Sequence, residues 1–259
     1  MSDYETRFSG LARLYGTPAL LRLRNAHVGV VGLGGVGSWA VEALARSGIG
    51  ALTLVDLDEV CVSNVNRQLH AFDSAVGRAK AEVMAERIRA INPECRVVPL
   101  PVYFTESNAD EILASDFDYI VDAIDAVPHK CRLIVGCRER NIPLVVCGAA
   151  GGRRDATAIR IADLTKVTHD RLLSEVRRQL RRAHGWSDNW GEFRVDCVFS
   201  AESPMFPQPD GTVCGKRAAS SDLRLNCDSG FGTASFVTGA FGLAAAGQVV
   251  SRIAEAVSD

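Results

Sequence analysis

The feature that most constrains the fold is a glycine-rich turn between an apolar run and a helical segment. The apolar run at 28–31 is followed by Gly32, Gly34, Gly35 and Gly37 in the spacing G-x-G-G-x-G. Glycines at such a turn allow a tight bend and a close approach of the backbone to phosphate, and the start of the following helix favours an anion. The pattern therefore predicts an α/β fold with a nucleotide lying across the start of a helix.

Apolar runs alternate with helical segments through the first 150 residues. The strands are expected at 28–31, 52–55, 96–100, 119–123 and 144–147, and the helices at 37–46, 75–92, 108–114 and 129–140. This alternation predicts a doubly wound, mostly parallel, Rossmann-like sheet.

The chain shows no linker or low-complexity tract, so we expect one domain over 1–259. Within it we expect a helical arm (1–25), a nucleotide-binding core (26–150) and a loop-rich, partly helical C-terminal third (151–259). This last part is expected to hold a strand at 158–161, a helix at 170–184 and a loop-rich stretch at 186–221. We expect it to serve substrate binding and dimerisation.

The composition sets outer limits on function. The 259 residues are 47% hydrophobic with a net charge of −2, so nucleic-acid binding must rest on a local patch. The eight cysteines form no C-x-x-C pair, which argues against structural zinc, and the polar N-terminus predicts a reducing cytoplasm. The uncharged stretch 229–251 is rich in small residues, which favours a buried or interface helix over membrane insertion. Peripheral membrane association stays open.

Two acidic residues follow the expected second strand. Asp56 stands at its end, where a carboxylate can accept hydrogen bonds from ribose hydroxyls. Asp58 comes two residues later and points to the same side if the chain stays extended. We expect both to contact the nucleotide, although Asp56 could instead cap a turn.

A polar loop at 63–68 carries Arg67, and Lys80 follows it. A guanidinium offers a planar fork to phosphate oxygens, and an ammonium offers a point charge. Two cations beside a triphosphate can stabilise the charge that develops on departing pyrophosphate. An NAD dehydrogenase does not break its pyrophosphate, so the pair indicates a nucleotide that is cleaved.

Asp122 and Asp125 follow the expected fourth strand in the sequence D-A-I-D. Carboxyl ends of parallel strands face the ligand crevice in this kind of sheet, and a carboxylate there can hold Mg²⁺ against phosphates. One of the two could instead cap the next helix. We favour Asp125 as the functional acid.

Together these residues resemble the ATP site of the ubiquitin-activating-enzyme-like (ThiF-type) superfamily, whose members activate a carboxylate as an acyl-adenylate. The resemblance implies catalytic roles for Arg67, Lys80 and Asp125, with Asp125 also as the Mg²⁺ ligand. Arg67 and Lys80 would contact the phosphates and Asp56 the ribose. The implied ATP-binding set is Gly32, Gly34, Gly35, Gly37, Asp56, Asp58, Asn64, Asn66, Arg67, Gln68, Lys80, Asp122 and Asp125.

Within the superfamily, the chain is similar to the bacterial dehydratases that act on threonylcarbamoyladenosine in tRNA. The likeness is carried along most of the chain, by the segments 13–16, 31–39, 66–68, 79–87, 91–96, 196–200, 210–214 and 227–232. It implies ATP-dependent cyclisation of the threonylcarbamoyl group at position 37 of tRNA, and a homodimer. A neighbouring nucleophile of the same modification would displace AMP, so the enzyme contributes positioning and electrostatic stabilisation.

Other side chains bear on this hypothesis less directly. At helical spacing Arg177, Arg178, Arg181 and Arg182 form one broad face that could contact tRNA phosphates, or simply be solvated. A thiol role for Cys227 or Cys197 is open beside ordinary packing, because ring closure within one nucleoside needs no covalent cysteine. Relatives can insert an arginine from the partner subunit into the ATP site, and Arg7 and Arg13 are the candidates for it here.

Three other readings compete with the leading one. The first is adenylation of a small ubiquitin-like sulfur-carrier protein, which the missing C-x-x-C pairs disfavour. The second is a non-catalytic nucleotide sensor or scaffold, and the last is an NAD dehydrogenase. A monovalent cation in the loop-rich third and sulfur-relay partner proteins also stay open.

Overall fold

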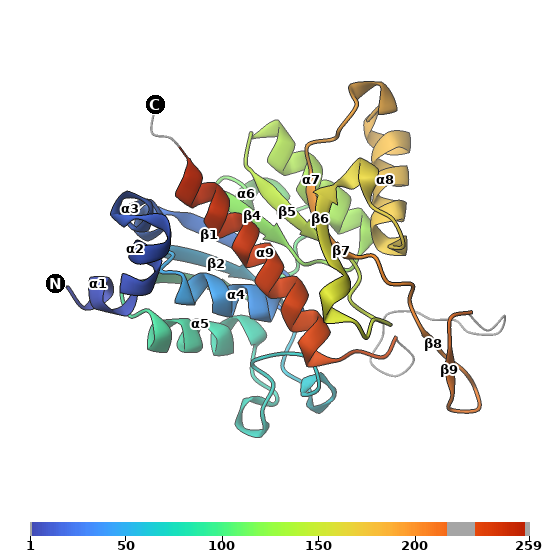
Figure 1. Cartoon of the computed structure of the whole chain (residues 1–259), viewed down its shortest axis with the longest axis horizontal. Coiled ribbons are helices and arrows are strands. Elements are labelled where there is room, and N and C mark those ends of the chain that lie inside the picture. The colour runs from blue at the N-terminus through green and yellow to red at the C-terminus, as the bar shows by residue number, and fades with distance from the viewer. Residues whose placement is uncertain (1, 217–230, 257–259) are drawn as a thin grey trace.

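A seven-stranded sheet forms the centre of the computed structural model, which describes residues 2–216 and 231–256. The strand order is β3-β2-β1-β4-β5-β7-β6, and all neighbours pair in parallel except β6, which runs antiparallel to β7. A separate hairpin, β8–β9, stands away from the sheet (Figure 1). The predicted doubly wound, mostly parallel sheet is therefore confirmed.

The strands are β1 (His27–Val31), β2 (Ala51–Val55), β3 (Arg96–Leu100), β4 (Tyr119–Asp122), β5 (Leu144–Cys147), β6 (Ile159–Asp163), β7 (Asp196–Ser200), β8 (Phe206–Pro207) and β9 (Val213–Cys214). The α-helices are α1 (Asp3–Arg7), α2 (Ser9–Tyr15), α3 (Thr17–Asn25), α4 (Gly37–Arg46), α5 (Lys80–Ile91), α6 (Ala109–Ile112), α7 (Val127–Glu139), α8 (Arg171–His184) and α9 (Ser235–Glu255). Short 3₁₀ turns η1 (Val62–Asn64), η2 (Asp73–Ala75), η3 (Ala156–Ala158), η4 (Leu164–Lys166) and η5 (Asp188–Trp190) lie in the connections.

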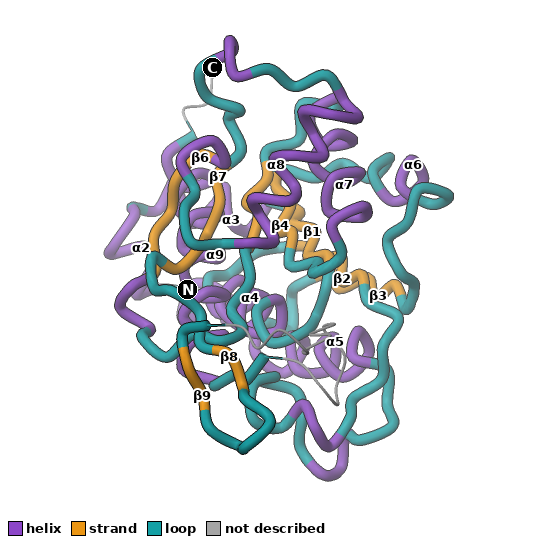
Figure 2. The backbone as a smooth tube through the Cα atoms, turned by 90° about the vertical axis from the view of Figure 1, so that its right-hand side faces the viewer, coloured by secondary structure: helices purple, strands orange, loops and turns teal. Residues whose placement is uncertain are grey.

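Helices cover both faces of the sheet, as Figure 2 shows with the strands between two layers. One core packs α4, α5 and α9 against β1 and β2, and it includes Leu44, Met84 and Phe241. The other core packs α6, α7 and α8 on the opposite face. Strands β1, β2, β4 and β5 are buried along their whole length, which explains their continuous apolar sequences.

Helix α9 crosses one face of the sheet beside α4 (Figure 1). It is the one helix among the described residues that is long and apolar enough to cross a bilayer, and 56% of its apolar window is buried within the protein. Gly242 lies so close to α4 that a Cβ there would come 2.4 Å from the Val36 carbonyl oxygen. The small residues of 229–251 thus serve, in α9, close packing against a neighbouring helix.

One local prediction left out a strand, and another was wrong. The stretch 186–221, expected to be loop-rich, also contains β7, a short strand held between β5 and β6. The helix expected from residue 75 begins at Lys80, because Gly77 adopts a φ of +82° that breaks the helix.

Candidate functional site

A cavity of about 610 Å³ lies at the carboxyl edge of the sheet. Its walls are the ends of β1, β2 and β5, the loop after β4, and residues at the starts of α8 and α9. The lining includes Gly32, Gly34, Gly35, Asp56, Asp58, Arg67, Lys80, Tyr103, Asp125, His129, Leu172 and Thr238. Many of the residues predicted from sequence thus share one space.

The glycine turn joins β1 to α4 at one wall of this cavity. Gly32 has a φ of +91°, and a Cβ there would lie 2.8 Å from the Ala123 carbonyl oxygen. At Gly37 a Cβ would lie 1.8 Å from the Gly32 carbonyl oxygen, so the turn closes only with glycine there. Gly34, by contrast, has open space where its Cβ would be.

Asp56 ties the turn to β2. Its Oδ2 accepts a hydrogen bond from the Leu33 backbone N–H (2.6 Å), and its Oδ1 accepts one from the Asp58 N–H (2.8 Å). Burial raises the pKa of this carboxyl, while Lys80 and the two backbone donors oppose the rise. Asp56 therefore shapes the site at the same time as it lines it.

Lys80 is held by Asp58, and both residues line the cavity. The Lys80 Nζ lies 2.7 Å from Asp58 Oδ2, and the Tyr103 hydroxyl donates to Asp58 Oδ1 at 2.7 Å. Burial alone would raise the pKa of Asp58, but the hydrogen bonds from Lys80 and Tyr103 lower it overall. The hydrogen bond with Asp58 raises the pKa of Tyr103 to about 12. Tyr103 escaped the sequence reasoning, although its place just after β3 was a usable signal.

The polar loop 63–68 places only Arg67 in the cavity wall. Arg67 Nη1 donates to the Ser63 carbonyl (2.6 Å) and to Asn66 Oδ1 (3.0 Å), which fixes the guanidinium. Asn66 also donates to the Thr233 carbonyl at 2.9 Å. Asn64 and Gln68 are buried and do not line the cavity, so they support the loop.

The loop is also anchored to two helices. The Arg67 carbonyl accepts hydrogen bonds from Trp39 Nε1 of α4 and from the Thr238 hydroxyl of α9, both at 3.1 Å. Helix α9 therefore supports Arg67 through Thr238, which lies 171 residues after it in the sequence. The sequence carried no signal of this contact.

Asp122 and Asp125 occupy different environments. Asp125 is exposed and lines the cavity. Asp122 is completely buried, 2.8 Å from Nζ of the equally buried Lys130 of α7, and does not line the cavity. The expectation that Asp122 itself contacts the nucleotide is thus corrected. Asp122 is buried next to the cavity-lining loop 123–126 and does not reach the cavity surface. Lys130 had no sequence signal.

The basic helix α8 does not present one free face. Arg177 Nη1 donates to the backbone carbonyls of Leu164 (2.9 Å) and Val167 (3.1 Å), and the Arg181 guanidinium lies 5.6 Å from the centre of the Phe193 ring. Arg178 is exposed but pairs with Glu175, and Arg182 is exposed. The prediction of a single broad basic face is therefore wrong. Of its four arginines, only Arg178 and Arg182 are exposed.

The two cysteines singled out from the sequence differ in what the structure says of them. Cys197 lies in β7, fully buried, and burial raises the pKa of its thiol well above the usual value. That argues against a thiolate role for Cys197. Cys227 lies outside the described residues.

The two N-terminal arginines do not line the cavity of their own chain. Arg7 pairs with Asp3 at 2.9 Å, and Arg13 is exposed on α2.

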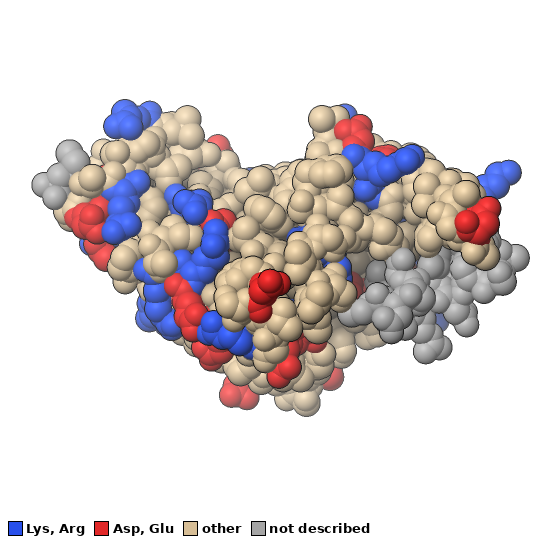
Figure 3. Space-filling model, turned by 90° about the horizontal axis from the view of Figure 1, so that it is seen from below, with Lys and Arg blue, Asp and Glu red and all other residues tan. Residues whose placement is uncertain are grey.

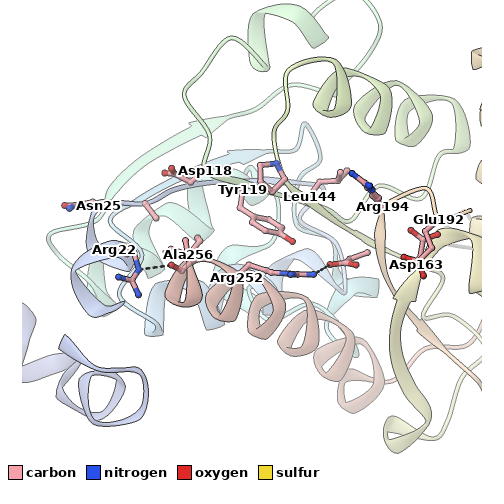
Figure 4. A pocket seen from close by; sticks show the side chains of 14 residues that line it. Arg22, Asn25, Asp118, Tyr119, Leu144, Asp163, Glu192, Arg194, Arg252 and Ala256 are labelled. Atoms are coloured by element: carbon pink, nitrogen blue, oxygen red, sulfur yellow. Dashed lines mark hydrogen bonds and ion pairs between the residues drawn. The ribbon is translucent and has the colours of Figure 1, made fainter. Parts of the chain in front are cut away.

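A second cavity, of about 830 Å³, opens at the amino edge of β4, β5 and β7 (Figure 4). Its charged groups are largely committed to the protein: Arg252 lies 3.2 Å from Asp196, and Arg22 donates to the Ile253 carbonyl at 3.2 Å. It lacks the glycine turn and the helix start that favour a phosphate. The carboxyl-edge cavity is therefore the candidate site.

Known proteins share this architecture. The chain matches the model of the ThiF family over residues 8–256. It is 50% identical over 252 residues to the tRNA threonylcarbamoyladenosine dehydratase of Escherichia coli (strain K12), with 96% of this chain and 94% of the relative covered. The solved structure of E. coli tRNA N6-threonylcarbamoyladenosine dehydratase in complex with ATP aligns with a TM-score of 0.87 at 46% identity, covering 97% of this chain and 96% of that one.

A relative that is named for a different activity matches less of the chain. The molybdopterin-synthase adenylyltransferase of Escherichia coli (strain K12) is 36% identical over 128 residues, 49% of this chain and 51% of the relative. The likeness to the dehydratase also includes the C-terminal half, with β7 and α9. The chain therefore belongs to the ThiF family and, within it, to the tRNA threonylcarbamoyladenosine dehydratases.

Proposed function

We propose that this chain is an ATP-dependent dehydratase that activates and cyclises N6-threonylcarbamoyladenosine at position 37 of tRNA. The observation that carries the proposal is the 50% identity to the E. coli dehydratase over 96% of the chain. The ATP complex of such a dehydratase, together with the glycine turn and cations of the cavity, supports ATP as the co-substrate. We place the reaction in the cytoplasm.

The cavity offers a group for each part of ATP. The turn at Gly34 and the start of α4 suit the phosphates, and Asp56 suits the ribose. Arg67 has further N–H groups beyond the fixed Nη1, and Lys80 adds a second cation. Asp125 is the exposed carboxylate that would hold Mg²⁺, which when bound neutralises phosphate charge.

The proposed reaction has two steps. A carboxylate oxygen of the threonyl group attacks the α-phosphorus of ATP, and the α–β bridging oxygen leaves with pyrophosphate. Arg67 and Lys80 stabilise the charge on that leaving group. A nucleophile of the same modified nucleoside then attacks the acyl carbon and AMP leaves, so the nucleoside loses one water overall. The chain holds the reactants in line and need not supply a nucleophile.

We also propose that the protein acts as a homodimer through the outer face of α9. Phe236 and Leu243 are 61% and 53% exposed, and their seven-residue separation puts them on one side of the helix. No charged residue lies between Ser235 and Ser251, so this stripe suits an apolar partner surface. A second copy would also bring its own N-terminal helices, with Arg7 and Arg13, to the complex.

Contacts with tRNA are proposed for Arg178 and Arg182, the exposed members of the four α8 arginines that helical spacing singled out. Figure 3 shows Lys and Arg interspersed with Asp and Glu over one face, rather than gathered in one unbroken basic patch. Recognition of tRNA would then depend on a few phosphate contacts and on the modified nucleoside itself.

The direct test is nucleoside mass analysis of tRNA carrying threonylcarbamoyladenosine. Incubation with the protein, ATP and Mg²⁺ should remove the mass of one water from that nucleoside and release AMP and pyrophosphate. Omitting ATP should leave the nucleoside unchanged. If the mass stays the same with every component present, the proposal fails; pyrophosphate exchange that requires a small sulfur-carrier protein would support the competing activity instead.

A further inference from the structure

The ion pair between Asp122 and Lys130 is unusual because both side chains are completely buried. Asp122 ends β4 and Lys130 lies one turn inside α7, and their Oδ1 and Nζ atoms are 2.8 Å apart. Lys130 is also among the largest fully buried side chains of the described residues. A buried pair of this kind is weak evidence for stability, because apolar residues of similar volume often serve as well or better. Its presence calls for another explanation.

The geometry of Asp122 supplies one. The same Oδ1 that meets Lys130 also accepts a hydrogen bond from the Ile124 backbone N–H at 3.0 Å. Ile124 belongs to the short loop 123–126, all four residues of which line the cavity, including Asp125. The start of this loop packs on the glycine turn, where a Cβ at Gly32 would lie 2.8 Å from the Ala123 carbonyl oxygen. One carboxylate oxygen thus joins α7 to the loop that carries Asp125.

We propose that Asp122 and Lys130 form a positioning pair that sets the loop 123–126, and with it Asp125, against the glycine turn. This rests on the proposed function, because it assigns Asp125 to the Mg²⁺·ATP complex. Asp122 and Lys130 touch no substrate and act only through the loop backbone. Lys130 keeps the carboxylate charged and oriented, so that Oδ1 stays available to the Ile124 N–H.

The charges around the pair fit this role. Burial raises the pKa of Asp122, and the charge and hydrogen bond of Lys130 oppose that rise. Asp122 Oδ2 has no hydrogen-bond partner among the described residues, so Oδ1 alone holds both contacts. Removal of Lys130 would leave a buried carboxylate that takes up a proton or turns away, and the loop would lose its fixed acceptor.

The test separates positioning from mere stability with two double variants. Lys130→Met with Asp122→Asn removes both charges but retains an oxygen that can accept from Ile124. Lys130→Met with Asp122→Leu removes the charges and the acceptor. Both avoid an unpaired buried charge, so both should fold, which thermal unfolding checks. Thr53→Val serves as a matched control, because it removes a buried hydrogen bond with His27 (2.8 Å) on the amino side of the sheet.

The readout is the affinity for ATP at several Mg²⁺ concentrations, measured by calorimetry on the full chain. We expect the Asn variant to bind Mg²⁺·ATP at least ten-fold more tightly than the Leu variant, with a smaller difference when Mg²⁺ is absent. Thr53→Val should bind like the wild type. Equal affinities for the two double variants would overturn the proposal. Because the readout is ATP binding, a wild type that binds Mg²⁺·ATP but leaves tRNA unchanged would overturn only the proposed function.

Discussion

Lys80 shows at the scale of one residue how the site keeps a charge in place before a substrate arrives. Its side chain is only 6% exposed, yet the residue lines the cavity and its Nζ is fixed by Asp58. Asp58 is fixed in turn by the Tyr103 hydroxyl. A cation held by a chain of hydrogen bonds needs little reorganisation when charge develops on a leaving group, which is the basis of electrostatic catalysis.

Lys80→Met should therefore lower kcat/KM for ATP by about 100-fold or more, the effect typical of losing one such preorganised group. The unfolding temperature should change little, because its partner Asp58 is 45% exposed and can be solvated. Lys166→Met is the matched control, since Lys166 pairs with Glu192 on the surface. Steady-state kinetics of pyrophosphate release with modified tRNA measure both variants. A loss for Lys80→Met no larger than that of the control would contradict the role.

The burial of His70 predicts that the stability of the fold depends on pH. It is fully buried with no hydrogen-bond partner for either ring nitrogen among the described residues, and burial, helped by Lys80, lowers its pKa to about 4. The unfolded chain takes up this proton near pH 6.5, so stability falls as the pH drops from about 6.5 to 4. With about 1.4 kcal/mol per pH unit, the wild type should lose up to roughly 3 kcal/mol relative to His70→Leu over that interval. Urea unfolding at several pH values tests this; parallel curves would refute it.

At the scale of an element, the turn between β1 and α4 offers two glycines with opposite roles. Gly37→Ala should unfold or distort the turn, because a Cβ would lie 1.8 Å from the Gly32 carbonyl oxygen. Gly34→Ala should leave the unfolding temperature nearly unchanged, because its Cβ would meet open space within the cavity lining. If a phosphate occupies that space, Gly34→Ala should still weaken ATP binding by ten-fold or more. Normal ATP affinity in a stable Gly34→Ala variant would place the nucleotide elsewhere.

The same element shows why much of the site could be read from the sequence. Gly32 and Gly37 are required by local geometry, and Asp56 and Asp125 follow strand ends that meet at one edge of a parallel sheet. Both kinds of signal are local, so a sequence displays them. The five strands expected within 26–150 were found on the same grounds.

What the sequence did not reveal depends on contacts between distant segments. Strand β7 has too short an apolar run to stand out, and it exists because β5 and β6 pair with it on both sides. The burial of Asp122 became evident only with Lys130 opposite it, and the inward turn of Arg177 only with the carbonyls of η4 beside it. Helical periodicity gives the direction in which a side chain leaves its own helix, but it does not show which distant segment the side chain meets.

At the scale of the whole molecule, α9 connects the core to the site and to the surface. Its inner face packs on α4 through Gly242, and Thr238 near its start bonds the Arg67 carbonyl. Its remaining face keeps Phe236 and Leu243 exposed. A membrane would have to take up this helix at the expense of the contacts with α4, whereas a second copy can cover the outer face and leave them intact.

Leu243→Glu should therefore convert a dimer into a monomer, because a charge buried in an apolar interface without a partner is costly. The matched control is Val213→Glu: Val213 is 53% exposed, the same as Leu243, but lies in the β8–β9 hairpin. Light scattering coupled to size exclusion should give a dimer for the wild type and Val213→Glu, and a monomer for Leu243→Glu with its folded circular dichroism spectrum kept. A wild-type monomer would refute the dimer itself, and a dimeric Leu243→Glu would move the interface away from α9. The same variant tests whether Arg7 or Arg13 of a partner completes the site. If either does, Leu243→Glu should also lose activity, and raising its concentration should not restore that activity as long as the protein stays monomeric.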